Sequence, residues 1–93
     1  MKFITFMDAR EYIKELGFEV GEFQPYVVSK FNFKKPTGFK KTGNVGMWLN
    51  LSKEERLNLD GIIVNKGLFN WNVVFKEDED FNKIVLNIET IEN

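Results

Sequence analysis

The first part of the chain carries apolar residues at helical spacing. They recur every three or four positions and share one helical face: Phe6, Ala9, Ile13 and Leu16. Thr5 stands before this run with Asp8 three positions later, which is typical of a capped helix start, and Gly17 is typical of a helix end. The pattern predicts a helix over residues 6–16, with Ile13 in the core.

Three further segments alternate between apolar and polar positions, which is the period of a half-buried strand. They span residues 26–33, 45–51 and 84–88. We also expect a short strand within residues 18–23, paired with the first of these segments. Phe31 is expected to lie in the core, on the apolar side of that first strand.

The middle of the chain predicts a second helix and a hairpin. Ser52 followed by Glu55 is a capping-box pattern, which favours a short helix over residues 53–59. Apolar residues 62–64 and 68–75 then flank Asn65-Lys66-Gly67, with glycine where a hairpin turn needs a positive φ. A longer helix that runs through Gly61 is the competing interpretation.

Together these elements predict one small α+β domain spanning residues 1–93. We expect an antiparallel or mixed β-sheet of four to five strands, an N-terminal helix and a short second helix. A chain of this length buries roughly 60 to 65% of its unfolded surface, which suffices for one core. Ten phenylalanines, two tryptophans and two tyrosines supply the apolar bulk for that core.

Composition removes several chemistries. The chain has no cysteine and no histidine, so we expect no thiolate nucleophile, no histidine-based triad, no Cys/His zinc site and no disulfide. The sequence therefore predicts no catalytic residues, no metal ligands and no cofactor. No apolar stretch reaches the roughly 18 to 20 residues of a membrane helix, and residues 3–7 are too short for a signal peptide. We expect a cytoplasmic protein that makes no membrane contact.

Three motifs resemble known sites only in part. Gly38 and Gly43 have the spacing of a phosphate-binding loop, but Asn44 follows where that loop needs lysine and then a hydroxyl residue. The acidic segment starting at Asp78 has a calcium-loop pattern, but Lys83 occupies the position that requires glycine. We interpret this segment as a solvated turn between strands. Glu54 and Glu55 are explained by a favourable interaction with a helix N-terminus rather than by paired-carboxylate catalysis.

Charge is segregated along a chain whose formal net charge is −1. Residues 30–45 carry five lysines and no acid, and four of these lysines lie in a predicted loop of 11 residues from Lys34 to Asn44. Loops of that length are often functional, because lysines bind phosphates and an exposed ring stacks on a base or enters a partner's pocket. The candidate binding residues are Lys30, Lys34, Lys35, Phe39, Lys40 and Lys41. The alternative is a solubilising loop with Phe39 folded back onto the core.

The resulting hypothesis is a small non-enzymatic binding module. We expect it to bind another protein through an aromatic-rich sheet edge and the basic loop, as a regulator or inhibitor. Its size and its lysine- and asparagine-rich composition would suit a phage or other mobile element, acting on a host protein that handles nucleic acid. Direct nucleic-acid binding through Lys30 to Lys41 is the alternative, although a basic domain is expected for that role. The sequence does not indicate an oligomeric state.

Overall fold

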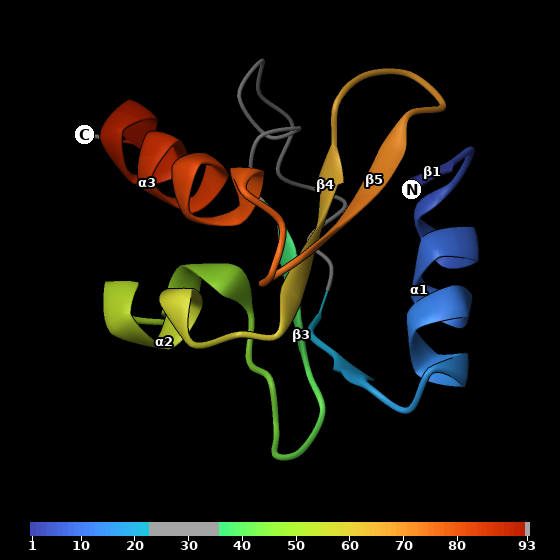
Figure 1. Cartoon of the computed structure of the whole chain (residues 1–93), viewed down its shortest axis with the longest axis horizontal. Coiled ribbons are helices and arrows are strands. Elements are labelled where there is room, and N and C mark those ends of the chain that lie inside the picture. Colours follow the sequence, from blue (N-terminus) through green and yellow to red (C-terminus); the bar gives the residue numbers. More distant parts are fainter. Residues whose placement is uncertain (23–35, 93) are drawn as a thin grey trace.

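The chain forms a five-stranded sheet with helices against both faces (Figure 1). The structure is a computed structural model that describes residues 1–22 and 36–92. Its elements are β1 (Lys2–Phe3), α1 (Phe6–Glu15), β2 (Glu19–Val20), β3 (Thr37–Lys40), the 3₁₀ helix η2 (Trp48–Asn50), α2 (Lys53–Leu57), β4 (Gly61–Asn65), β5 (Trp71–Phe75) and α3 (Asp80–Glu92).

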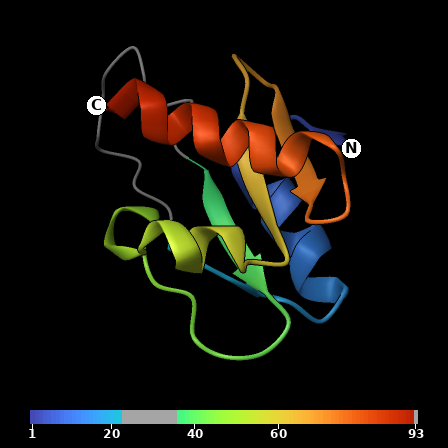
Figure 2. The same cartoon turned by 60° about the vertical axis from the view of Figure 1, so that its left-hand side comes forward.

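All strand pairs in this sheet are antiparallel, in the order β1-β5-β4-β3-β2. Helix α1 covers one face, whereas α2 and α3 lie together on the other, as the rotated view shows (Figure 2). The predicted α+β class is confirmed, and the short strand expected within residues 18–23 is β2. In the described part of the chain, β2 pairs with β3. The predicted strand over residues 26–33, including Phe31, lies outside the described residues.

Helix α1 begins and ends where its capping residues predict. The Thr5 side chain accepts a hydrogen bond from the Asp8 backbone N–H at 3.1 Å. Gly17, just beyond the helix, has a φ of +94°, which a glycine adopts without steric strain. Ile13 is fully buried as predicted, but Leu16 remains 47% exposed. Leu16 shares the apolar face by its spacing but is exposed because the helix ends at Glu15 and Leu16 is its C-cap.

The second capped helix and the hairpin are also confirmed. The Ser52 side chain accepts from the Glu55 backbone N–H, and the Glu55 carboxylate accepts from the Ser52 backbone N–H, so both halves of the capping box of α2 are present. Strands β4 and β5 pair along their full length, from Gly61 opposite Phe75 to Asn65 opposite Trp71. The competing helix through Gly61 is wrong.

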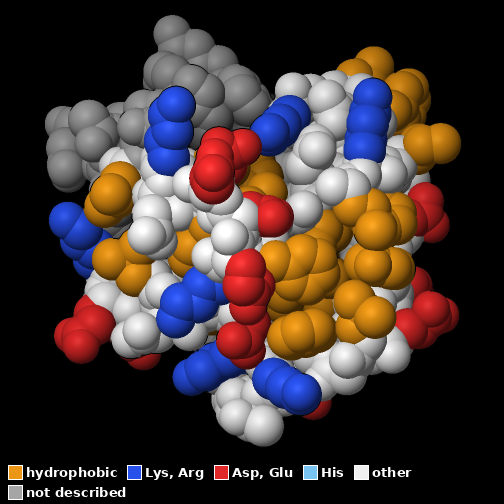
Figure 3. Space-filling model, in the orientation of Figure 1, with side chains coloured by type: hydrophobic (Ala, Val, Ile, Leu, Met, Phe, Trp, Pro, Cys, Tyr) orange, Lys and Arg blue, Asp and Glu red, His pale blue; other side chains and the backbone are white. Residues whose placement is uncertain are grey.

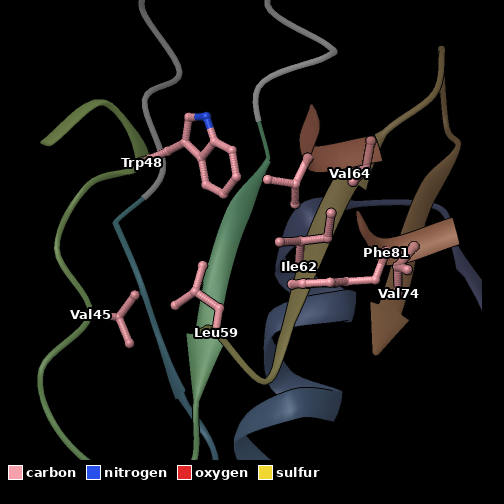
Figure 4. Close-up of a cluster of buried hydrophobic side chains, with 8 residues drawn as sticks. Val45, Trp48, Leu59, Ile62, Val64, Val74 and Phe81 are labelled. Atoms are coloured by element: carbon pink, nitrogen blue, oxygen red, sulfur yellow. The ribbon is translucent and has the colours of Figure 1, made fainter. Parts of the chain in front are cut away.

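Strand β4 separates two hydrophobic clusters, because successive side chains of a strand point to opposite faces. Ile63 belongs to the cluster beneath α1, whereas Ile62 and Val64 belong to the cluster beneath α2 and α3. Members of the second cluster converge from the strands, α3 and the segment that carries Trp48 (Figure 4). Coverage of both faces explains why β4 reads as a continuous apolar run rather than as an alternation.

The predicted strand over residues 84–88 is wrong, since these residues belong to helix α3. Phe81 and Val85 are four positions apart and both fully buried, with Ile84 packed beside them. This spacing places all three on one helical face. Alternation within 84–88 is a weaker signal than this longer helical pattern. The acidic segment therefore connects a strand to a helix, and not two strands.

The strand predicted over residues 45–51 is wrong as well. Val45 and Trp48 are both buried, and the backbone around Trp48 forms the 3₁₀ helix η2. Positions three apart eclipse one another in such a helix, so burial here does not follow a period of two.

The long loop expected between Lys34 and Asn44 is interrupted by β3, which lies between β2 and β4. Thr37, Gly38 and Phe39 are all buried within it.

Candidate binding surface

The structure changes the basic site that the sequence predicts. Phe39 is fully buried, and its ring packs against those of Phe18 and Phe75 with centroids 5.1 and 5.5 Å away. The prediction of an exposed Phe39 is therefore wrong, because its side chain points into the layer between the sheet and α1. Lys40 and Lys41 are both exposed at the end of β3. The other three predicted residues lie outside the described residues: Lys30, Lys34 and Lys35.

Acidic groups lie close to the two described lysines of this segment. The Lys41 backbone N–H donates to the Asp60 carboxylate at 2.7 Å. The pKa of Glu55 is lowered mainly by the hydrogen bond from the Ser52 backbone, with a smaller contribution from the positive charge of Lys40. These acids reduce the positive potential that a phosphate would meet at Lys40 and Lys41.

A second surface is richer in apolar groups. It consists of five half-buried rings on the α1 side of the sheet, which we call the aromatic edge: Phe3, Tyr12, Phe18, Trp71 and Phe75. Phe3 contacts Tyr12 with ring centroids 5.3 Å apart, and it lies opposite Trp71 in the β1–β5 pairing. Figure 3 shows hydrophobic side chains gathered between the sheet and α1 on this side of the molecule.

The β4–β5 turn extends this apolar surface. Leu68 and Phe69, which we call the hairpin tip, are 85% and 62% exposed. Hydrogen bonds fix the turn beneath them: the Lys66 backbone N–H donates to the Asn70 carbonyl at 2.8 Å, and the Gly67 N–H donates to the Asn65 side chain at 2.8 Å. The hairpin tip is therefore held in a defined place at the end of the sheet.

Phe69 has a backbone conformation that a bulky side chain seldom adopts. Its φ of +57° is in the left-handed region, which costs an ordinary residue about 1–2 kcal/mol and which glycine or asparagine tolerates better. Because the ring is mostly exposed, core packing does not account for phenylalanine at this position. Strain combined with exposure is a feature of residues that contact ligands or partners.

The outer edge of β5 is closed to an added strand where its N–H groups are already bonded. The Val73 N–H donates to the Met1 carbonyl at 2.9 Å, and the Phe75 N–H donates to the Asp78 carboxylate at 3.0 Å. Such blocking of a sheet edge disfavours pairing with another chain's backbone. The edge strand on this side is β1, which has only two residues, so a molecule bound here would contact mainly side chains.

Acidic side chains border the aromatic edge on two sides. The acidic turn begins two positions after Phe75, beyond Lys76, and its four members are all exposed: Glu77, Asp78, Glu79 and Asp80. On α1, Asp8 and Glu15 are exposed four positions before and three positions after Tyr12, so helical geometry places them beside it. Figure 3 shows red acidic side chains on both sides of the hydrophobic area.

The motifs that resemble phosphate and calcium sites do not form such sites. Gly38 lies within strand β3, where a phosphate-binding loop would need a turn before a helix. Asp80 and Asn82 begin α3, so the backbone does not wrap around a cation at this position. Across residues 1–22 and 36–92, no three acidic side chains are grouped as metal ligands would be.

Two features of the structure were missed by sequence reasoning. The sequence predicts a strand through the hairpin tip, and no local signal indicates its exposure, because leucine and phenylalanine are usually buried. Arg56 is buried, with its guanidinium carbon 4.5 Å from the centre of the Trp48 ring and its Nε donating to the Trp48 carbonyl at 3.2 Å. In Figure 4 the indole nitrogen of Trp48 lies on the side of the ring away from Leu59. Because both residues are buried, we infer that this contact stabilises the fold and does not bind a ligand.

The chain has no significant match to a protein-family model, a curated protein or a solved structure. The proposed function therefore rests on the geometry of the described surface. Among the helices of the described residues, none has the length and apolar character needed to cross a membrane.

Proposed function

We propose that this protein is a small non-enzymatic module that binds another protein through the aromatic edge and the hairpin tip. The observation that carries the proposal is the exposed Leu68 and Phe69 on a turn fixed by hydrogen bonds, with Phe69 in a strained conformation. The strained backbone conformation exposes the Phe69 ring. A partner's pocket would bury this ring and remove it from water, which would give the strain a function.

The composition of the surface supports a protein partner. Trp and Tyr are the residues that most often dominate protein interfaces, and Trp71 and Tyr12 are both half-buried at the aromatic edge. Half-buried rings have already lost much of their side-chain freedom, so they lose little more on binding. Occupation of a partner's surface would make the module a cytoplasmic regulator or inhibitor. An origin in a phage or mobile element is a hypothesis based only on size and composition.

Several observations support a non-enzymatic role. The chain has neither histidine nor cysteine. Glu55 and Asp78 are engaged in hydrogen bonds that shape a helix start and a turn. These hydrogen bonds explain both positions without a catalytic role.

Affinity capture from the source cells with three forms of the protein tests the proposal. Phe69→Asn should remove a captured protein while leaving folding stability equal or higher, because asparagine tolerates the left-handed conformation. Leu86→Ser is the matched control, since Leu86 is a 41% exposed apolar residue of α3 on the other side of the sheet. Wild-type and Leu86→Ser baits should retain the same protein. Equal capture by all three forms would contradict the proposal.

Direct nucleic-acid binding is the second candidate, favoured by the adjacent exposed side chains of Lys40 and Lys41. Gel-shift titrations at two salt concentrations test it. Four lysines on phosphates of a single strand predict a slope of log affinity against log salt of about −3. The slope should largely disappear after alanine replacement of Lys34, Lys35, Lys40 and Lys41. Absence of any shift at low salt would rule this function out.

A further inference from the structure

We propose that the segment bound at the aromatic edge is a basic amphipathic helix of the partner, with an apolar ridge between lysine or arginine side chains. This inference rests on the proposed function and specifies the chemistry of the partner. It follows from the arrangement of charge around the aromatic edge and from the closed edge of β5.

The acidic turn supplies negative charge on the sheet side. Asp78 is held against the sheet because its carboxylate accepts the Phe75 N–H, so this charge lies next to a ring of the aromatic edge. Glu77 and Glu79 are its exposed neighbours, and Lys76 is the single base of this segment. Four acids against one base give residues 76–80 a net charge of −3. Asp60 bonds to the backbone of both Lys41 and Lys76, and counting it with its neighbours Lys40 and Lys41 leaves this end of the sheet at −2.

Helix α1 supplies negative charge on the opposite side. Tyr12 contacts Phe3 of β1, which identifies the flank of α1 that faces the aromatic edge. Asp8 and Glu15 share this flank by their spacing from Tyr12. The two bases of α1, Arg10 and Lys14, are each two positions from Tyr12 and therefore lie on the opposite flank.

An apolar strip between two acidic borders complements a partner that is apolar along its centre and basic along both sides. Opposite charges at the rim of an interface raise the association rate and exclude partners of the same sign. The same borders repel phosphate groups, which disfavours a nucleic acid at this surface. A helix suits the strip because its side chains make the contacts, whereas an added strand would need the N–H groups of Val73 and Phe75 that are already bonded.

Synthetic peptides provide the probe. Each has about five helical turns and the same leucines at helical spacing, and its polar positions are all lysine, all glutamate or all glutamine. Fluorescence anisotropy of the labelled peptides with the full-length protein should give the tightest binding for the lysine peptide. Its affinity should fall as ionic strength rises.

Two double variants with the same change in net charge form the matched pair. Glu15→Gln with Glu79→Gln neutralises one acid on each border. Glu22→Gln with Glu54→Gln neutralises two exposed acids away from the aromatic edge, just after β2 and on α2. We expect the border variant to bind the lysine peptide about 3- to 10-fold more weakly, mainly through the association rate, and the control to stay within about twofold of wild type.

The outcomes separate this inference from the proposed function. Equal weakening by both double variants would show an effect of overall charge and overturn the inference. Equal affinity for all three peptides would also overturn the inference, and so would a failure of all three peptides to bind. If the peptides bind equally and Phe69→Asn abolishes capture from cells, the aromatic edge is a binding surface without the inferred charge preference. If the lysine peptide alone binds but Phe69→Asn captures normally, the proposed use of the hairpin tip fails.

Discussion

Two glycines allow large side chains to pack on both faces of the sheet. At Gly61 of β4, an added methyl group would overlap the ring of Phe39, which crosses this position to reach Phe75. At Gly38 of β3, it would overlap Leu59 on the other face. Close approach therefore explains glycine inside both strands, where it is otherwise unfavourable.

Gly61→Ala should destabilise the protein by about 1–3 kcal/mol, because the added methyl group overpacks a filled site. Gly46→Ala is the control, since a methyl group at Gly46 meets no atom within 4 Å. It should change the free energy of unfolding by about 0.5 kcal/mol or less. Urea denaturation of both variants measures this difference, and equal effects would show that the packing of Phe39 over Gly61 is not tight.

Among the helices, strands and turns, the sequence predicted correctly those features that depend only on hydrogen bonds between residues close in the chain. The capping residues Thr5 and Ser52 and the turn before Gly67 specify hydrogen bonds within a few residues, and the structure contains them. Strand β3 could not be predicted in this way, because its Thr-Gly-Phe-Lys sequence is a poor strand pattern. Burial between β2 and β4 and the close approach of Leu59 to Gly38 determine it, and these are long-range contacts.

The buried face of α1 gives a second prediction. Ile13→Ala should cost about 2–5 kcal/mol, because Ile13 is fully buried and its loss leaves a cavity beneath the helix. Leu16→Ala removes a side chain that is 47% exposed and should cost about 1 kcal/mol or less. The two variants are compared by urea denaturation. A loss below about 0.5 kcal/mol for Ile13→Ala would contradict the assignment of this face to the core.

The capping box of α2 makes part of the stability dependent on pH. The pKa of Glu55 is lowered in the folded protein, mainly by the hydrogen bond from the Ser52 backbone. Its contribution is therefore complete above the ordinary glutamate pKa of about 4.3, and it is lost as the pH falls through the lowered folded value.

Glu55→Gln tests this contribution because glutamine keeps the hydrogen-bonding shape of the capping box without the charge. Urea midpoints of the wild type should exceed those of the variant near neutral pH, and the difference should shrink toward zero once the pH falls below the lowered folded pKa of Glu55. A difference that stays constant with pH would mean that the charge of Glu55 contributes nothing to folding.

At the scale of the whole molecule, the fold brings the basic and acidic segments to the same end of the sheet. Asp60 joins them, because its carboxylate accepts from the Lys41 N–H and its carbonyl accepts from the Lys76 N–H. The acidic turn and the acids of α1 border the aromatic edge, whereas Lys40 and Lys41 lie at the end of β3, near Asp60 and Glu55. Sequence reasoning found the basic segment because charge is visible in a linear chain. The sequence also predicted binding through an aromatic-rich sheet edge, but not which residues form it, because the fold assembles the aromatic edge from α1, β1, β5 and the segment between α1 and β2.

Site-specific photo-crosslinking in the source cells measures whether the hairpin tip and the aromatic edge face the partner protein. A photoreactive phenylalanine derivative in place of Phe69 keeps an aromatic ring at the tip, and the same derivative in place of Leu86 reports on the opposite side of the sheet. We expect a covalent adduct with one protein from position 69 and none from position 86. An adduct from position 86 with none from position 69 would contradict the proposal.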